Sequence, residues 1–153
     1  MARTTTVEIR PFTESLPMAL LQAREAAMRL FRPMLAEHDL TEQQWRVLRA
    51  LSSAEGPLEP GEIVDVTFLL APSVSRILAH LTERGLVDRT PVAEDGRRAA
   101  ISLTTAGTAL VAEVAPHSER TYDDIEAVIG PGELDELIRR LTALRDNLTD
   151  GEV

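Results

Sequence analysis

Apolar residues recur at helical spacing along most of this chain. They follow an i, i+3, i+4 pattern over residues 16–35, in the segment that starts at Trp45, and over residues 134–144. This spacing places apolar side chains on one face of an α-helix. We therefore predict a long first helix that Pro33 kinks near its end, a second helix, and an amphipathic last helix.

Capping residues and prolines set the boundaries of the shorter helices. Thr41 and Gln44 have the spacing of a capping box, with Thr41 as the N-cap and Gln44 at the third position. Pro60 suits the first turn of a short third helix. Pro72 is expected at the first position of a fourth helix that runs to Arg84. The glycine that follows is expected to end this helix in a left-handed conformation.

The period of the pattern falls from about 3.6 to two after the fourth helix, which is typical of strands. We predict strands over residues 86–90 and 99–103. The Asp-Gly pair at 95–96 supplies the turn signal of a hairpin between them.

A fifth helix is predicted after the hairpin. Thr104 or Thr105 is expected to cap it, and it reaches about Ile129. Pro116 is expected to interrupt or weaken it, because proline removes a helical hydrogen bond. The Gly-Pro-Gly run at 130–132 separates it from the last helix.

This order of elements predicts a mainly α fold with a small β-hairpin wing. Two short helices joined by a tight turn, the second followed by a hairpin, form a winged helix-turn-helix, whose second helix lies in the DNA major groove. We expect residues 1–12 to be a flexible segment and residues 13–153 to be a single domain. Its winged core spans about 41–104, and the helices at about 13–36 and 105–150 are expected to dimerise.

Charge is unevenly distributed along the chain. The net charge is −9, and residues 101–153 carry 4 Arg and 11 acidic residues, whereas residues 71–100 carry 5 Arg and 4. All 16 basic residues are Arg, whose rigid fork of donors suits phosphates and guanine edges. The predicted fourth helix and most of the wing therefore lie in residues 71–100, the only one of the three segments without net negative charge.

Several chemistries are excluded or disfavoured. The chain has no Cys, which excludes disulfides and thiolate zinc sites. No Ser/His/Asp order, paired-His motif or glycine-rich phosphate loop is present, so we expect no enzyme, no catalytic residue and no cofactor. Glu113 and His117 have the spacing of half a metal site, but a solvated helix face is the preferred interpretation, and no metal is expected.

No apolar run approaches the roughly 20 residues that span a membrane, and the N-terminus lacks a secretory signal. The sequence thus predicts a cytoplasmic location and no membrane partner.

The fourth helix carries the first set of candidate DNA contacts. Its buried stripe is predicted to be Val74, Ile77, Leu78 and Leu81, at i, i+3, i+4 and i+7. The residues left to face DNA are Pro72, Ser73, Ser75, Arg76 and His80. Taken alone, this face also fits an ordinary solvated surface.

The hairpin tip carries the second set. Arg97 and Arg98 suit the negative potential of a narrow minor groove, and Asp95 is interpreted as a carboxylate that holds Arg97 in position. A solvated charged turn is the alternative.

Four segments together resemble the MarR family of transcription regulators. They are Leu70–Leu78, Leu81–Val87, Glu94–Arg98 and Ile101–Gly107, and the family pattern spans about residues 15–147. The resemblance implies a homodimer that reads successive major grooves of a pseudo-palindromic double-stranded DNA operator. It also implies a small aromatic carboxylate or phenolic effector, bound between the dimer helices and the winged lobe.

A narrower resemblance covers Ala19–Met28, Phe31–Pro33 and Leu40–Arg46. These segments are similar to the HpaR-type subgroup, which represses homoprotocatechuate (4-hydroxyphenylacetate) catabolism. The resemblance implies a ligand-responsive repressor of an aromatic catabolic operon. Ser75 and Arg76 differ from the subgroup, which leaves the operator sequence open.

An aromatic carboxylate needs an arginine fork and an apolar or aromatic wall. Trp45 is a candidate wall or, alternatively, a core residue. Arg24 is a candidate fork, or the partner of Glu25 or of an acid from a second chain. The full set of candidate effector residues is Arg24, Arg32, His38, Trp45, Arg46 and Arg49.

Other interpretations stay open at this level. The terminal apolar stripes pack either on a partner chain or on each other within one monomer. The chain is alternatively a MarR-type regulator of an efflux or stress regulon with another phenolic ligand, or a helical dimerisation protein that does not bind DNA.

Overall fold

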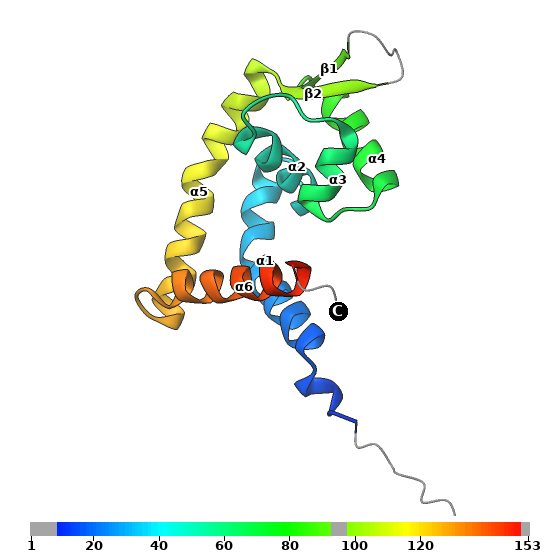
Figure 1. The fold of residues 1–153 in the computed structure, drawn as a ribbon. Helices are drawn as coiled ribbons and strands as arrows, with labels where there is room; N and C mark the ends of the chain where they lie inside the picture. Colours follow the sequence, from blue (N-terminus) through cyan, green and yellow to red (C-terminus); the bar gives the residue numbers. More distant parts are fainter. Residues whose placement is uncertain (1–8, 93–97, 151–153) are drawn as a thin grey trace, which may run out of the picture.

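The computed structural model describes residues 9–92 and 98–150. Within them the chain forms six α-helices, one short 3-10 turn and one two-stranded antiparallel sheet (Figure 1). The elements are η1 (Phe12–Glu14), α1 (Leu16–Glu37), α2 (Glu42–Ser53), α3 (Pro60–Thr67), α4 (Ala71–Glu83), β1 (Val87–Pro91), β2 (Ala99–Leu103), α5 (Thr105–Ile129) and α6 (Glu133–Asp150). The predicted mainly α fold with a hairpin wing is confirmed. Most of the predicted flexible segment, residues 1–8, lies outside the described residues.

The predicted helix caps form as expected. The hydroxyl of Thr41 accepts from the N–H of Gln44 at 3.2 Å, and the side chain of Gln44 accepts from the N–H of Thr41 at 3.0 Å. Thr104, not Thr105, caps α5 by accepting from the N–H of Gly107 at 3.0 Å. These caps fix where α2 and α5 start.

Helices α1 and α5 both continue through an internal proline. α1 passes through Pro33 and ends at Glu37. α5 is continuous through Pro116, so the predicted interruption there is wrong. Tertiary packing explains the continuity, because α5 is anchored on both sides of the proline. The buried residues of α5 include Val111, Val114, Ser118 and Thr121.

The hairpin starts one residue later than predicted. Gly85 adopts a left-handed φ of 68°, and the N–H of Leu86 then bonds back to the carbonyl of Leu81 at 2.9 Å. Leu86 therefore completes the end of α4, and β1 starts at Val87, paired with Leu103.

The core lies in the winged lobe and draws on α1 to α5 and both strands. Its most deeply buried side chains are Leu35, Val47, Leu48, Ile63, Val74, Leu81, Val87, Ile101 and Val114. The backbone of Leu58, just before α3, pairs in both directions with Ile101 of β2, at 2.9 and 2.7 Å. Helices and hairpin thus form one packed unit.

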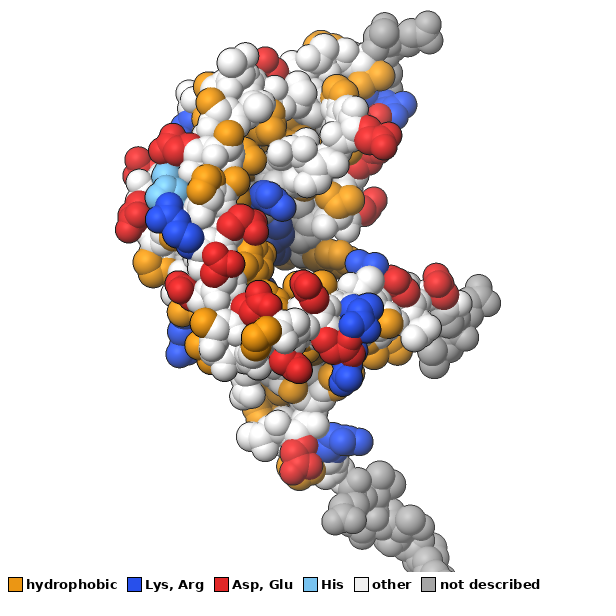
Figure 2. Space-filling view, turned by 90° about the vertical axis from the view of Figure 1, so that its left-hand side faces the viewer, with side chains coloured by type: hydrophobic (Ala, Val, Ile, Leu, Met, Phe, Trp, Pro, Cys, Tyr) orange, Lys and Arg blue, Asp and Glu red, His pale blue; other side chains and the backbone are white. Residues whose placement is uncertain are grey.

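The two ends of the described chain lie away from this lobe. In Figure 1, α5 runs from the hairpin end of the lobe to α6, at the far end from the hairpin. α6 buries none of its residues. Figure 2, seen from the α5 side, shows acidic side chains with hydrophobic ones among them over this part of the surface.

Among the described residues, no single helix is long and apolar enough to span a membrane. By length and composition alone, α3 and α4 taken together could span one, but the two helices meet at an angle of 115°.

Candidate nucleic-acid interface and effector site

α4 presents the face that the sequence predicts. Val74, Ile77, Leu78 and Leu81 are buried, and this packing turns the opposite face to solvent. The exposed residues there include Pro72, Ser75, Arg76 and His80, whereas Ser73 is half-buried. Arg76 makes no ion pair with any residue in the described ranges. Its guanidinium is therefore available to a base edge or a phosphate.

Pro72 lies at the second position of α4 and not at the first. Leu70 is extended, with φ −71° and ψ 142°, and serves as N-cap, so Ala71 takes the first position. Proline is accepted here because the first N–H groups of a helix have no intrahelical partner.

The wing is described only up to its outer end. Asp95 and Arg97 lie outside the described residues, so their predicted roles stay predictions. Arg98 is described, and its guanidinium meets the carboxylate of Glu59 through two hydrogen bonds, one of them from Nε at 3.1 Å. This bond raises the pKa of Arg98 above its ordinary value.

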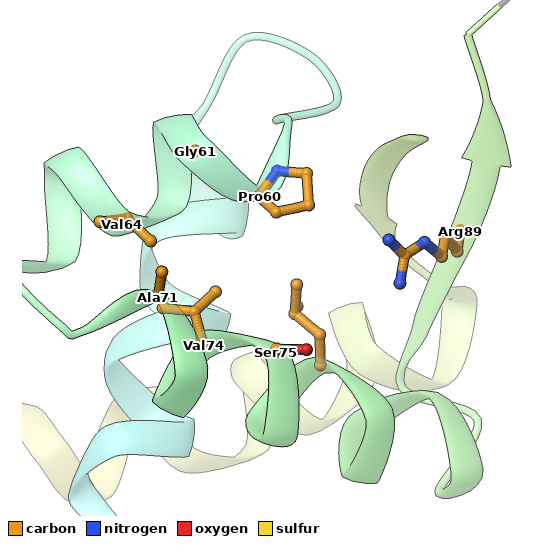
Figure 3. Close-up of a pocket in the computed structure, with 8 residues that line it drawn as sticks. Pro60, Gly61, Val64, Ala71, Val74, Ser75 and Arg89 are labelled. Atoms are coloured by element: carbon orange, nitrogen blue, oxygen red, sulfur yellow. The ribbon is translucent and has the colours of Figure 1, made fainter. Parts of the chain in front are cut away.

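A further cation, Arg89, was not predicted as a contact. It shares the face of β1 with the buried Val87, but it lies where the core ends and is exposed. Figure 3 shows its guanidinium reaching from β1 toward a small hollow between α3 and α4, near Pro60 and Ser75. The period-two alternation of the strand, counted from Val87, is the sequence signal that places Arg89 on this side.

Three of the candidate effector residues converge on one acid. Arg24 and Arg32 of α1 and Arg46 of α2 all form ion pairs with Glu42 at the start of α2. Arg32 also donates two hydrogen bonds to the carboxylate of Glu25, at 2.6 and 2.8 Å. Glu25, one of the alternatives for pairing Arg24, thus pairs with Arg32, and Arg24 pairs with Glu42.

The charges in this cluster stabilise one another. Burial acts to raise the pKa of Glu42, but the bonds from Arg24 and Arg32 outweigh it and leave the pKa below its ordinary value. The bond from Arg32 likewise lowers the pKa of Glu25. The pKa of Arg32 is raised well above its ordinary value by both acids. Glu25, Glu42 and Arg32 are consequently ionised at neutral pH.

Arg46 connects this cluster to the helix-turn-helix. Its Nη1 donates to the carbonyl of Thr67 at 3.2 Å, at the last residue of α3. Phe68 follows with a left-handed φ of 55° and starts the turn to α4. One side chain thus contacts both the α1–α2 junction and the turn before the predicted recognition helix.

Trp45 and Arg49 lie further along the same helix. The guanidinium of Arg49 lies 5.9 Å from the centre of the Trp45 ring, within cation–π range. Trp45 is half-buried and packs against the core. Arg46 and Arg49 also line an open cleft between α2 and α3, with Leu58 and Val66.

Comparison with known proteins identifies the family. The MarR family matches residues 38–98. The homoprotocatechuate degradative operon repressor of Escherichia coli is 41% identical over 129 residues, which cover 84% of this chain and 86% of that protein. The chain belongs to the MarR family.

Two further proteins are similar to this chain over most of their length. The HTH-type transcriptional regulator FarR of Neisseria gonorrhoeae is 36% identical over 137 residues, 88% of this chain and 93% of that protein. The crystal structure of NadR in complex with 4-hydroxyphenylacetate superposes with a TM-score of 0.75 at 35% identity, and covers 90% of this chain and 96% of that one. This MarR protein is therefore a DNA-binding transcription regulator and not an enzyme.

The sixth candidate effector residue, His38, does not contact the arginines around Glu42. It contacts residues of α5 instead. Its Nδ1 lies 3.3 Å from the carboxylate of Glu113, and its ring centre lies 5.2 Å from that of His117. His38 thus contacts both Glu113 and His117, the two residues that have the spacing of half a metal site. No group of three His, Asp or Glu in the described part of the chain is arranged to hold a metal ion.

Proposed function

We propose that this protein is a dimeric repressor of an aromatic catabolic operon, released from a pseudo-palindromic operator by a small aromatic acid. The observation that carries the proposal is the cluster of Arg24, Arg32 and Arg46 around Glu42. Glu42 lies on α2, which also carries the cation–π pair of Trp45 and Arg49. Arginine forks and an aromatic wall are what an aromatic carboxylate requires. One similar protein is named as a homoprotocatechuate degradative operon repressor, and another, NadR, is crystallised in complex with 4-hydroxyphenylacetate. Both support the same ligand class.

The proposed route from ligand to DNA runs through Arg46. A carboxylate that enters the cluster competes with Glu42 for the arginines. Arg46 would then change its contacts with Glu42 and with the Thr67 carbonyl, which is next to the turn that leads to α4. Binding of the acid and binding of DNA are thereby coupled, and each lowers the affinity for the other.

Dimerisation is supported by apolar surface at the two ends of the chain. Leu137, Ile138 and Leu141 are between 40% and 49% exposed on α6, and Leu16, Leu20, Leu21 and Leu30 on α1 are exposed as well. Large apolar side chains that stay exposed on two helices favour burial against a second chain. A two-fold dimer would place two copies of α4 about one helical turn of DNA apart.

Replacing Ile138 with Glu is expected to convert the dimer into monomers at micromolar concentration, because it buries a carboxylate in the apolar interface. Analytical ultracentrifugation measures this. Ala143→Glu adds the same charge to the opposite face of α6, and this variant should remain dimeric. If Ile138→Glu also sediments as a dimer, α6 is not part of the interface.

The effector class is tested by thermal unfolding with a panel of hydroxyphenylacetates, benzoates and cinnamates. At about 100 times its dissociation constant, a true ligand adds roughly 2.7 kcal/mol of stability and raises Tm by several degrees. The same compound should release operator DNA. Arg49→Ala should lose most of the shift, and Arg120→Ala, on α5, should keep it. A panel without any stabilising compound contradicts the aromatic-acid proposal.

A further inference from the structure

The side chain of Arg98 joins the outer end of the wing to the start of α3. Its guanidinium meets both carboxylate oxygens of Glu59, with Nε at 3.1 Å from Oε2 and Nη2 on Oε1. The two residues are 39 positions apart in sequence. Two parallel bonds of this kind fix the direction of the arginine fork as well as its position.

The position of Glu59 is itself fixed. Its own N–H donates to the side chain of Glu62 at 2.7 Å, at the first turn of α3. The preceding residue, Leu58, is paired through its backbone with Ile101 of β2. Arg98 therefore binds a carboxylate that the body of the lobe holds in place.

Few residues in the two described strands of the hairpin are buried. In β1 only Val87 is buried, and the other four residues are exposed. In β2 only Ile101 is buried. An isolated two-stranded hairpin is marginally stable at best, so its outer half depends on what ties it to the helices.

We propose that Arg98 is a positioning residue, which clamps the wing to the start of α3 through Glu59 and so sets where the wing meets DNA. This assignment rests on the DNA-binding function, and it replaces the sequence-based expectation that Arg98 contacts DNA. Two of the five N–H donors of Arg98 are taken up by Glu59, and the carboxylate balances its charge, so Arg98 has less to offer a phosphate. In the clamp, Glu59 matters for DNA binding although it carries the same sign of charge as DNA.

The two roles of Arg98 predict opposite effects for Glu59→Gln. If Arg98 is a clamp, removing the Glu59 charge frees the wing and lowers operator affinity. If Arg98 contacts a phosphate, the same change removes a competing anion and raises the affinity. Asp65→Asn is the matched control, because it removes one exposed acid from α3 without a bond to Arg98.

The experiment measures operator affinity of the full-length dimer at several salt concentrations, for the wild type, Arg98→Gln, Glu59→Gln, the double variant and Asp65→Asn. We expect each single change to lower affinity about 5-fold relative to Asp65→Asn, the double variant to be no weaker than the singles, and the salt slope to be unchanged. Thermal unfolding verifies that all variants are folded. Non-additivity is the signature of one shared interaction.

Four outcomes overturn the assignment. The first three are a gain in affinity for Glu59→Gln beyond that of Asp65→Asn, additive effects, and a salt slope that falls by about one for each Arg98 removed, as loss of a phosphate contact requires. Unchanged affinity in both single variants overturns it as well. Failure of the wild type itself to bind any promoter DNA is a separate result, since it contradicts the DNA-binding function and not the clamp.

Discussion

Replacing Arg76 with Ala is expected to lower operator affinity about 100-fold. The side chain is exposed on α4, next to Ser75. A bidentate arginine–guanine contact is worth roughly 1–3 kcal/mol, and a dimer presents it twice. Fluorescence anisotropy with labelled operator measures the loss, and sedimentation should show that the variant is still a dimer.

Arg120→Ala is the matched control for this prediction. It removes the same charge from α5, where Arg120 bonds to Pro116 and contacts His117. This variant should bind operator within about 2-fold of the wild type. Arg120 lies outside the α4 face and the wing, so its loss changes only the long-range electrostatic field of the protein. Equal loss in the two variants would mean that net charge, and not the α4 face, determines binding.

Replacing Gly107 with Ala is expected to lower the free energy of unfolding by about 3 kcal/mol, the upper part of the range for overpacking. An added Cβ would lie 2.0 Å from the carbonyl oxygen of Leu86, a backbone atom at the start of the hairpin. Relief requires α5 and the hairpin to separate. Urea unfolding measures the loss, which corresponds to a fall in Tm of roughly 10 °C.

Gly61→Ala tests whether this effect comes from the close contact. Gly61 also lies in a helix, but an added Cβ there meets nothing within 4 Å. Its stability should be equal to that of the wild type or slightly higher, because alanine has the greater helix propensity. A Gly107→Ala variant as stable as Gly61→Ala would show that the packing of α5 on Leu86 is not as close as described.

Features that depend on neighbouring residues could be predicted from the sequence. The stripe Val74, Ile77, Leu78 and Leu81 is buried as its spacing predicts, because helical period alone determines which side chains share a face. The capping box at Thr41 and the left-handed Gly85 are equally local. The fold class follows from such features, since their order specifies the winged helix-turn-helix.

Features that depend on distant residues could not be predicted. Arg24 and Glu42 are 18 positions apart, and Arg98 and Glu59 are 39 apart. Which acid pairs with which arginine depends on how α1, α2 and the wing pack, and no local period encodes this. Pro116 is a related case, because intrinsic propensity predicts a break that tertiary packing overrides.

The central claim is that this MarR protein binds a specific operator as a dimer through α4 and the wing. The most direct test is a titration of the wild type against the promoter DNA beside its own gene and against scrambled DNA, at about 150 mM salt. The account predicts one dimer per site and at least a 1,000-fold preference for the promoter, the lower end for specific regulators. Equal affinity for both DNAs, or no binding even at low salt, would contradict it.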